Sequence, residues 1–151
     1  RAVISDFTLM LQKEVVERLV APPDNKTYGV PSVLFQMYAE VEKMFDVPAS
    51  CFYPRPKVES SIIRGIFRQK PLVELADEEF FSRLVKAAFA QRRKTLMNNL
   101  KRAALMENVP EEKIWEALDE ARIDGRRRGE NLTVDEFGHL ANILKIHKAH
   151  R

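Results

Sequence analysis

The sequence predicts an α/β segment followed by a small all-α domain. Residues 1–72 hold short apolar runs of strand length, whereas from Asp77 onward apolar residues recur with the period of a helix. A sheet of this class needs more strands and covering helices than residues 1–72 provide to bury both of its faces. We therefore expect two units, an incomplete α/β part over residues 1–72 and a helical domain over residues 73–151.

The first half begins with a strand and a helix. Thr8–Gln12 is a short apolar run, which predicts a buried strand, and Lys13–Val20 alternates apolar and polar residues in a helical pattern. Pro22 and Pro23 then break the chain. Ser32 is expected to cap a second helix, because its hydroxyl can accept a hydrogen bond from a free backbone N–H group.

Two further strands are predicted over Val41–Val47 and Val58–Phe67. The segment 48–57 between them contains three prolines. Because proline fixes φ and lacks an N–H donor, this segment is expected to be a rigid, extended connection and not a strand within a sheet.

Four helices are predicted after the sheet, because apolar stripes with helical spacing follow residues that cap helices. The second of these helices is expected to reach Ala104. The last begins with a capping box, in which two side chains satisfy backbone N–H groups. The four predicted starts are Asp77, Thr95, Pro110 and Thr133–Glu136.

Charge is distributed unevenly along the chain. Lys and Arg number 25 against 22 Asp and Glu, so the net charge is only +3. Residues 80–106, however, contain seven bases and no acid. Segregation of this kind is typical of a surface that faces a polyanion. On composition alone, a nucleic-acid-binding surface and an ordinary solvent-exposed helix face explain these clustered bases equally well.

Several classes of protein are excluded. The single cysteine, Cys51, rules out a disulfide framework, and it forms no metal-ligand set with the histidines. No apolar run approaches the roughly 20 residues that span a bilayer. We expect a cytoplasmic protein without a metal or a membrane partner.

Several motifs resemble those of the rRNA adenine dimethyltransferases. Residues 52–60, FYPRPKVES, resemble the family's Phe-x-Pro-x-Pro-Lys-Val-x-Ser motif, and residues 88–100, AFAQRRKTLMNNL, are similar to a second signature. Tyr28-Gly29 with Ser32 and Gln36 resembles a third, and residues 128–132 a fourth. The blocks occur in order over nearly the whole chain. The chain is therefore similar to the C-terminal portion of the bacterial small-subunit (kasugamycin-resistance) branch of this family.

The resemblance implies a fold, an activity and partners. The fold is a Rossmann-like S-adenosylmethionine methyltransferase domain followed by a small helical domain that binds RNA. The activity is N6,N6-dimethylation of two adjacent adenosines near the 3′ end of small-subunit rRNA, during ribosome biogenesis. The implied partner is rRNA in the immature small subunit, and the intact enzyme is expected to be a monomer.

Two motifs of the family are missing from the sequence. One is the glycine-rich loop that holds the methionine end of S-adenosylmethionine, and the other is the Asn-x-Pro-Tyr motif that positions the adenine amine. We therefore expect the chain alone to bind no cofactor and to be inactive.

Phe52 is the expected catalytic-region residue. An adenine that leaves its stack needs an aromatic face to replace its neighbours, and the family's motif phenylalanine is thought to provide one. Without the motif, a core residue at the sheet edge would be the better interpretation of Phe52. Arg55 and Lys57 flank it and could neutralise phosphate.

The basic residues around the second and fourth motifs are expected to contact the RNA backbone, helped by the N-terminus of the helix that Thr95 opens. Recognition would be of shape and backbone and not of base sequence. At least one of Arg92 and Arg93 is expected to fasten the two units together instead, and Arg128 could pair with Glu130. The expected RNA-binding residues are Arg55, Lys57, Gln91, Arg92, Arg93, Lys94, Lys101, Arg102, Arg126, Arg127 and Arg128.

Three alternatives remain open. A non-catalytic RNA-binding or ribosome-assembly module would need only the basic helical half. The large-subunit rRNA adenine methyltransferases share the first motif, but the Gln-Arg-Arg-Lys block and the closing Arg-x-Glu-Asn-Leu helix favour the small-subunit branch. A helix-turn-helix DNA-binding protein would account for the short basic helices but not for the strands.

Overall fold

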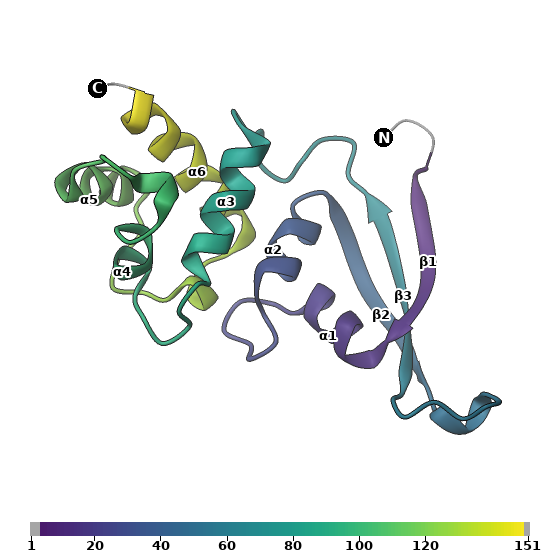
Figure 1. Ribbon diagram of the computed structural model, residues 1–151. Helices are drawn as coiled ribbons and strands as arrows, with labels where there is room; N and C mark the ends of the chain where they lie inside the picture. Colours follow the sequence, from purple (N-terminus) through teal and green to yellow (C-terminus); the bar gives the residue numbers. More distant parts are fainter. Residues whose placement is uncertain (1–3, 150–151) are drawn as a thin grey trace.

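The computed structural model describes residues 4–149, so the first three residues of the predicted α/β part and the last two of the predicted helical domain lie outside it. The described chain is an α/β structure with three strands and six helices, as its sequence predicts (Figure 1). Its first half contains β1 (Asp6–Gln12), α1 (Lys13–Val20), α2 (Val30–Gln36), β2 (Ala39–Val47) and β3 (Ser60–Phe67). Its second half contains α3 (Glu78–Ala88), α4 (Leu96–Leu100), α5 (Glu111–Glu120) and α6 (Val134–Ala149).

The strands form an antiparallel sheet in the order β1-β3-β2. A register shift in β2 between Lys43 and Phe45 bends that strand. Helices α1 and α2 lie against one face of the sheet (Figure 1). Phe7 of β1 packs on this face against Phe35 of α2, with the ring centroids 5.8 Å apart. The ring also covers Gly65 of β3, where a Cβ atom would lie 2.1 Å from it, so any larger residue would displace the Phe7 ring.

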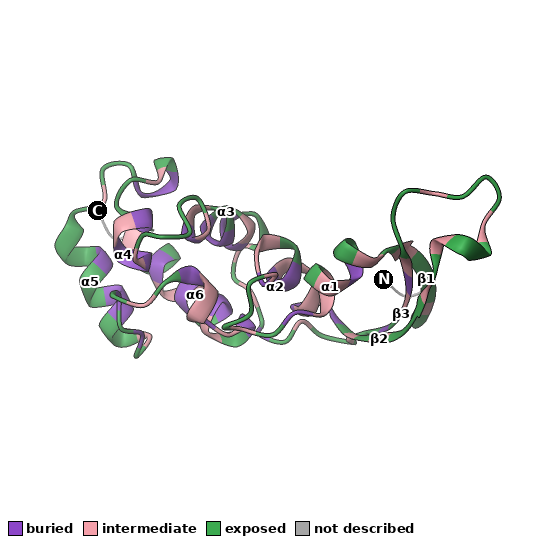
Figure 2. Cartoon of the chain, turned by 90° about the horizontal axis from the view of Figure 1, so that it is seen from below, coloured by how far each residue is buried: buried purple, intermediate pink, exposed green. Residues whose placement is uncertain are grey.

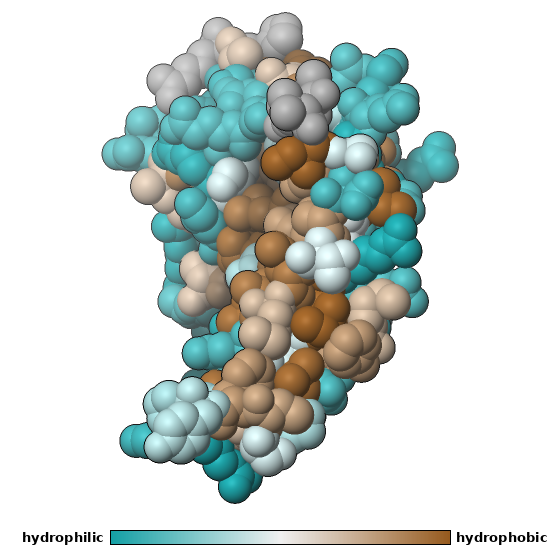
Figure 3. Space-filling model, turned by 90° about the vertical axis from the view of Figure 1, so that its right-hand side faces the viewer, coloured by the Kyte–Doolittle hydropathy of each residue, from teal (hydrophilic) through white to brown (hydrophobic). Residues whose placement is uncertain are grey.

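The opposite face of the sheet is open. The register aligns Met10, Ile62 and Phe45 across the three strands, and Met10 and Phe45 are 50% and 59% exposed. Figure 3 shows apolar side chains gathering in a band over this side of the molecule. The prediction of a buried first strand is wrong for this structure, because β1 is an edge strand with one uncovered face.

Local capping determines most of the helix starts. The Asp77 carboxylate accepts a hydrogen bond of 2.8 Å from the Phe80 N–H, and the Thr95 hydroxyl accepts one from Asn98. The Thr133 backbone N–H donates to the Glu136 carboxylate at 2.8 Å, which confirms the predicted capping box.

Three helix boundaries differ from the prediction, those of α2, α4 and α5. Helix α2 begins at Val30, so Ser32 lies in its first turn, where its hydroxyl accepts from the Gly29 N–H and donates to the Arg18 carbonyl. Helix α4 ends at Leu100, and the chain continues into a separate 3-10 turn, Ala104–Met106. Pro110 is the cap of α5 and lies one residue before its first turn.

One hydrophobic core joins the two halves. It contains Tyr28, Val33 and Met37 from the first half together with apolar side chains of α3, α4, α5 and α6. Figure 2 shows buried residues concentrated among these helices. Because this core crosses residue 72, the division into units over 1–72 and 73–151 remains a proposal.

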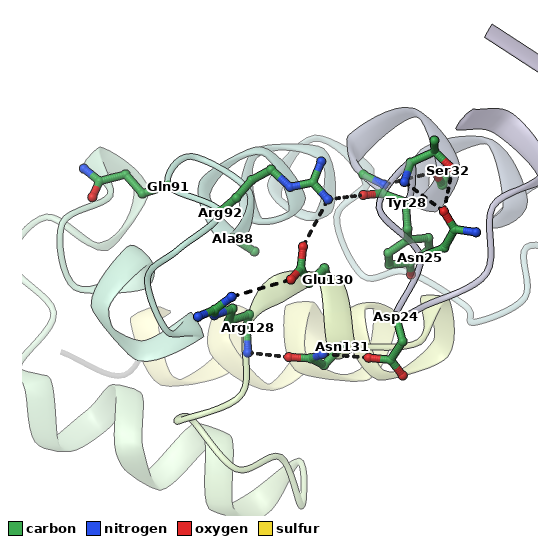
Figure 4. A network of polar contacts seen from close by, with 12 residues as sticks. Asp24, Asn25, Tyr28, Ser32, Ala88, Gln91, Arg92, Arg128, Glu130 and Asn131 are labelled. Carbon is green, nitrogen blue, oxygen red and sulfur yellow. Dashed lines mark hydrogen bonds and ion pairs between the residues drawn. The ribbon is translucent and has the colours of Figure 1, made fainter. Parts of the chain in front are cut away.

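A loop of the first half is fastened to the second half by polar contacts. Tyr28 is fully buried, and its hydroxyl donates a 2.8 Å hydrogen bond to the Leu132 carbonyl. Burial raises the pKa of the Tyr28 phenol, so the group stays protonated and able to donate. Nearby, the Asp24 N–H donates to the Glu130 carbonyl at 2.9 Å, and the Asn131 amide donates to the Asp24 carboxylate (Figure 4). We call these contacts between residues 24–28 and 128–132, together with the Arg92 side chain that hydrogen-bonds to both segments, the inter-half lock.

None of the helices in the described residues is both long enough and apolar enough to cross a bilayer.

The inter-half lock predicts a stability difference between two tyrosine variants. Tyr28→Phe removes the donor from a buried carbonyl and is expected to lower the free energy of unfolding by about 1–3 kcal/mol. Tyr53→Phe makes the same chemical change at a fully exposed side chain and should have no effect. Urea unfolding followed by circular dichroism measures both, and equal stabilities would contradict the role of the Tyr28 hydroxyl.

Candidate nucleic-acid interface

The turn between α3 and α4 carries the Gln-Arg-Arg-Lys block and is held from inside by a buried amide. Asn99 is only 5% exposed, and its side-chain nitrogen donates to the carbonyls of Ala88 at 2.8 Å and Gln91 at 3.1 Å. These two bonds tie α4 to the end of α3 and to the first part of the turn. Asn99 was not among the predicted site residues, although it belongs to the second motif.

A basic groove of about 420 Å³ runs beside this turn. Arg83 and Lys86 line it from α3, and Arg102 lines it from the segment after α4. No acidic residue lines the groove, so the positive potential inside it is not neutralised locally. Its other lining residues are Ala87, Ala90, Gln91, Asn99, Ala103, Ala104 and Leu105.

Arg83 and Lys86 were not predicted as site residues. The signal that could have found them is the acid-free run over residues 80–106, to which both belong. Their position three residues apart on α3 places them on one face of that helix.

The exposed bases of this region are largely free of carboxylates. Within residues 4–149, no ion pair is made by the exposed side chains of Arg83, Lys86, Arg93, Lys94 and Arg102. Lys101 lies 3.7 Å from Glu111, a long contact between two partly exposed groups. We call Arg83, Lys86, Gln91, Arg93, Lys94, Lys101 and Arg102 the basic surface.

Two arginines of the predicted site are used by the fold instead. Arg92 donates to the Glu130 carboxylate at 3.0 Å and to the Tyr28 carbonyl at 3.3 Å, which makes it part of the inter-half lock (Figure 4). It therefore has the structural role that we expected of at least one of Arg92 and Arg93.

Arg127 is likewise engaged in the structure. Its guanidinium makes two hydrogen bonds to Glu136, of 2.6 and 2.9 Å, and a third to the Asn131 carbonyl. The bonds to Glu136 raise the pKa of Arg127 further. A bidentate pair of this kind fixes both side chains, so we leave Arg127 out of the basic surface.

The other two arginines of this loop remain near the surface. Arg126 is exposed, and Arg128 lies 3.9 Å from Glu130, as the sequence indicated it could. The chain at Gly129 passes close to the end of α3, where a Cβ atom would lie 2.8 Å from the Ala88 carbonyl oxygen. Only glycine permits this approach, which brings the 126–128 loop beside the basic surface.

The N-terminus of α4 is not available to an anion, contrary to our expectation. The Leu96 N–H donates to the Arg127 carbonyl at 2.7 Å, and the Met97 N–H donates to the Gly125 carbonyl at 3.1 Å. The Thr95 hydroxyl accepts a hydrogen bond from the Asn98 N–H, and the Thr95 carbonyl accepts one from the Asn99 N–H. Because each of these donors has a protein partner, phosphate binding here would depend on side chains alone.

Phe52 lies in a different part of the molecule. It belongs to the β2–β3 loop, which we define as residues 48–59 and which projects from the end of the sheet away from α4, α5 and α6 (Figures 1 and 2). Phe52 is half-buried, whereas Arg55 and Lys57 are exposed. The bond between Tyr53 and Pro54 is cis. The structure therefore does not bring the predicted stacking residue together with the basic surface.

The described residues offer little that could hold a metal or the family's cofactor. Among them, no group of three or more His, Cys, Asp or Glu side chains is arranged to hold a metal ion. The five glycines of the chain are dispersed, and none adopts a positive φ. Residues 4–149 therefore do not form a glycine-rich cofactor-binding loop.

Comparisons of the sequence give a consistent result. Residues 1–145 match the family model described as ribosomal RNA adenine dimethylase. The chain is 48% identical over 147 residues to the ribosomal RNA small subunit methyltransferase A of Bacillus cytotoxicus, and equally to that of Bacillus cereus. These alignments cover 96% of this chain and 50% of each relative. The chain thus spans about half the length of the curated relatives it matches.

Solved structures resemble the fold as well. A dimethyladenosine transferase from Plasmodium falciparum superposes with a TM-score of 0.82 at 26% identity, covering 98% of this chain and 59% of that one. The 23S rRNA methyltransferase ErmE gives a TM-score of 0.62 at 24% identity, covering 94% of this chain and 55% of that one. At that identity, the second likeness concerns the fold alone.

The Arg127–Glu136 pair predicts a dependence of stability on pH. Partial burial opposes ionisation of Glu136, yet hydrogen bonds from Arg127 and Thr133 lower its pKa below the usual 4.5. A lowered carboxyl pKa contributes stability that is complete above the usual value and is lost as pH falls through the lowered one. The free energy of unfolding should therefore decrease as the pH falls below about 4.5.

The decrease should be smaller in Glu136→Gln, measured by urea unfolding at a series of pH values. Glu112→Gln, which neutralises an exposed carboxylate of α5, serves as the matched control. An identical pH dependence in Glu136→Gln and in the unaltered chain would contradict the assignment.

Proposed function

The chain belongs to the ribosomal RNA adenine dimethylase family, and we propose that it supplies the RNA-binding and base-stacking part of an rRNA adenine N6,N6-dimethyltransferase. The proposed target is two adjacent adenosines near the 3′ end of small-subunit rRNA, within the immature subunit in the cytoplasm. The 48% identity to small-subunit relatives supports this choice over the large-subunit branch. The proposed enzyme acts as a monomer.

The observation that carries the proposal is the basic groove. Its three cations converge on one cavity with no acid in the lining, whereas cations elsewhere, such as Lys113 and Lys145, pair with carboxylates at 2.6 Å. Bringing phosphates to unpaired cations releases counterions from the nucleic acid, which drives binding. The proposed RNA surface consists of Arg83, Lys86, Gln91, Arg93, Lys94, Lys101 and Arg102, extended by Arg126 and Arg128.

Phe52 is the proposed stacking residue for the target adenine. Methylation of an exocyclic amine requires the base to leave its stack. Phe52 is only half-buried, so part of its side chain is accessible to such a base. Arg55 and Lys57, both exposed, are proposed to contact the phosphates on either side of that base. The RNA would then bridge the basic surface and the β2–β3 loop.

S-adenosylmethionine is the proposed methyl donor of the complete enzyme. Residues 4–149 do not fit the methionine end of that cofactor, because they form no glycine-rich loop with a positive φ. We propose that the part of the relatives that this chain does not span holds the cofactor. The chain alone is then proposed to be inactive.

A non-catalytic RNA-binding module is the second candidate function. The observation that favours it is that the basic groove lies wholly within residues 83–105, apart from the sheet. The two functions differ in what they require of Phe52, since a module that only binds RNA needs no stacking platform.

The basic groove predicts a change in the salt dependence of RNA binding. Lys86→Gln combined with Arg102→Gln should weaken binding to small-subunit rRNA fragments and reduce the slope of log affinity against log salt by about 2. Lys70→Gln changes an exposed lysine that lies outside the groove and should leave the slope nearly unchanged. If the double variant keeps both its affinity and its slope, the groove does not bind RNA.

The cofactor proposal predicts the outcome of a titration. Calorimetric titration of the chain with S-adenosylmethionine should give no saturable heat, because the glycine loop and the Asn-x-Pro-Tyr motif are absent from the sequence. Titration of a Bacillus relative under the same conditions is the positive control. A micromolar site on this chain would refute the proposal.

A further inference from the structure

Charged side chains at the base of the β2–β3 loop converge on Lys13, the first residue of α1. The Lys13 ammonium donates to the Glu59 carboxylate at 2.8 Å and lies 3.2 Å from the Asp46 carboxylate. Asp46 precedes the loop at the end of β2, and Glu59 is the last residue of the loop before β3. One ammonium group therefore joins the two ends of the loop.

Backbone and neighbouring side chains reinforce this junction. The Lys13 N–H donates to the Glu59 carbonyl at 3.0 Å. The second oxygen of Asp46 accepts a 2.6 Å hydrogen bond from the Ser61 hydroxyl and lies 2.9 Å from the Lys43 ammonium. Hydrogen bonds from Ser61 and Lys43 hold the pKa of Asp46 well below its usual range, so the carboxylate stays ionised at neutral pH.

The base of the loop has little apolar packing that could join its two ends or fix its orientation. A hollow of about 260 Å³ lies there, and Gln12, Lys13, Glu14, Glu17, Val58 and Glu59 line it. Tyr53 and Val58, which flank Pro54 and Pro56, are exposed, and Phe52 is only half-buried. The loop otherwise projects from the sheet, as Figure 1 shows. Its orientation therefore depends on the polar contacts at its base.

We propose that Lys13 is a positioning residue that sets the orientation of the β2–β3 loop and thereby the place of Phe52. This inference rests on the proposed stacking function of Phe52. Lys13 itself acts through the loop and does not contact the base. Because the three side chains are between a third and a half exposed, their ion pairs contribute little to global stability, and their effect is on loop geometry.

The single cysteine of the chain allows loop order to be measured directly. Cys51 is exposed and precedes Phe52, so a nitroxide spin label attached to it reports the motion of the loop. Lys13→Met should increase the mobile fraction of the label's spectrum roughly 2- to 5-fold, as expected for loss of an exposed ion-pair network. Glu59→Ala should reproduce the increase from the other side of the contact, and Lys13→Arg should restore order.

Arg18→Met is the matched control, since it removes a cation from the same helix that pairs with Glu14 and not with the loop. The proposal is overturned if Lys13→Met leaves the spectrum unchanged, or if Arg18→Met mobilises the label equally. Circular dichroism of each variant verifies that the helices are retained.

The consequence for RNA is tested with a fragment that carries 2-aminopurine at the target adenosine. Its fluorescence change on binding reports base unstacking and restacking, and anisotropy reports affinity. Lys13→Met should reduce the fluorescence change while affinity stays the same, and Lys13→Arg should recover it. A loss of affinity with an unaltered fluorescence change would overturn the positioning role.

Phe52→Ala separates this inference from the proposed function. If it leaves the fluorescence change intact, the stacking function of Phe52 fails. The spin-label measurement on Cys51 then still decides whether Lys13 orients the loop.

Discussion

The arrangement of the basic surface depends on the inter-half lock, in which a buried phenol and a guanidinium join segments more than a hundred residues apart. Tyr28 donates to the Leu132 carbonyl, and Arg92 donates to both Glu130 and the Tyr28 carbonyl. If the two segments separated while Tyr28 stayed buried, its hydroxyl would lose its partner, at a free-energy cost larger than the net contribution of the bond. The two segments are therefore held in one relative position. The loop of residues 24–28, the end of α3 and the 128–132 segment therefore take up fixed positions together.

This constraint divides the arginines of the chain into two groups. Arg92 and Arg127 contact carboxylates and carbonyls and belong to the framework. Arg93 and Arg102 are exposed and pair with no carboxylate within residues 4–149. Adjacent residues in one basic block thus serve opposite purposes. The framework arginines orient the turn, and the free ones supply the positive potential that we propose binds RNA.

Features that depend on neighbours in the sequence were predictable. The caps at Asp77, Thr95 and Thr133 were predicted correctly, because each involves a bond over three residues. Features that depend on distant contacts were not. The N–H groups at the start of α4 are taken by carbonyls of residues 125 and 127, and β1 has an open face that its apolar sequence does not reveal. The sequence could indicate that one of Arg92 and Arg93 is structural, but the choice depends on the position of Glu130.

The inter-half lock fixes the helical half relative to the sheet. Pulsed electron paramagnetic resonance tests this arrangement by measuring the distance between two nitroxide labels. The labels are attached at Arg64→Cys on β3 and Lys113→Cys on α5, in a Cys51→Ser background. A fixed arrangement of the two halves predicts one narrow distance distribution, which broadens when Tyr28→Phe and Arg92→Met are combined. Distributions of equal width with and without those two substitutions would contradict it.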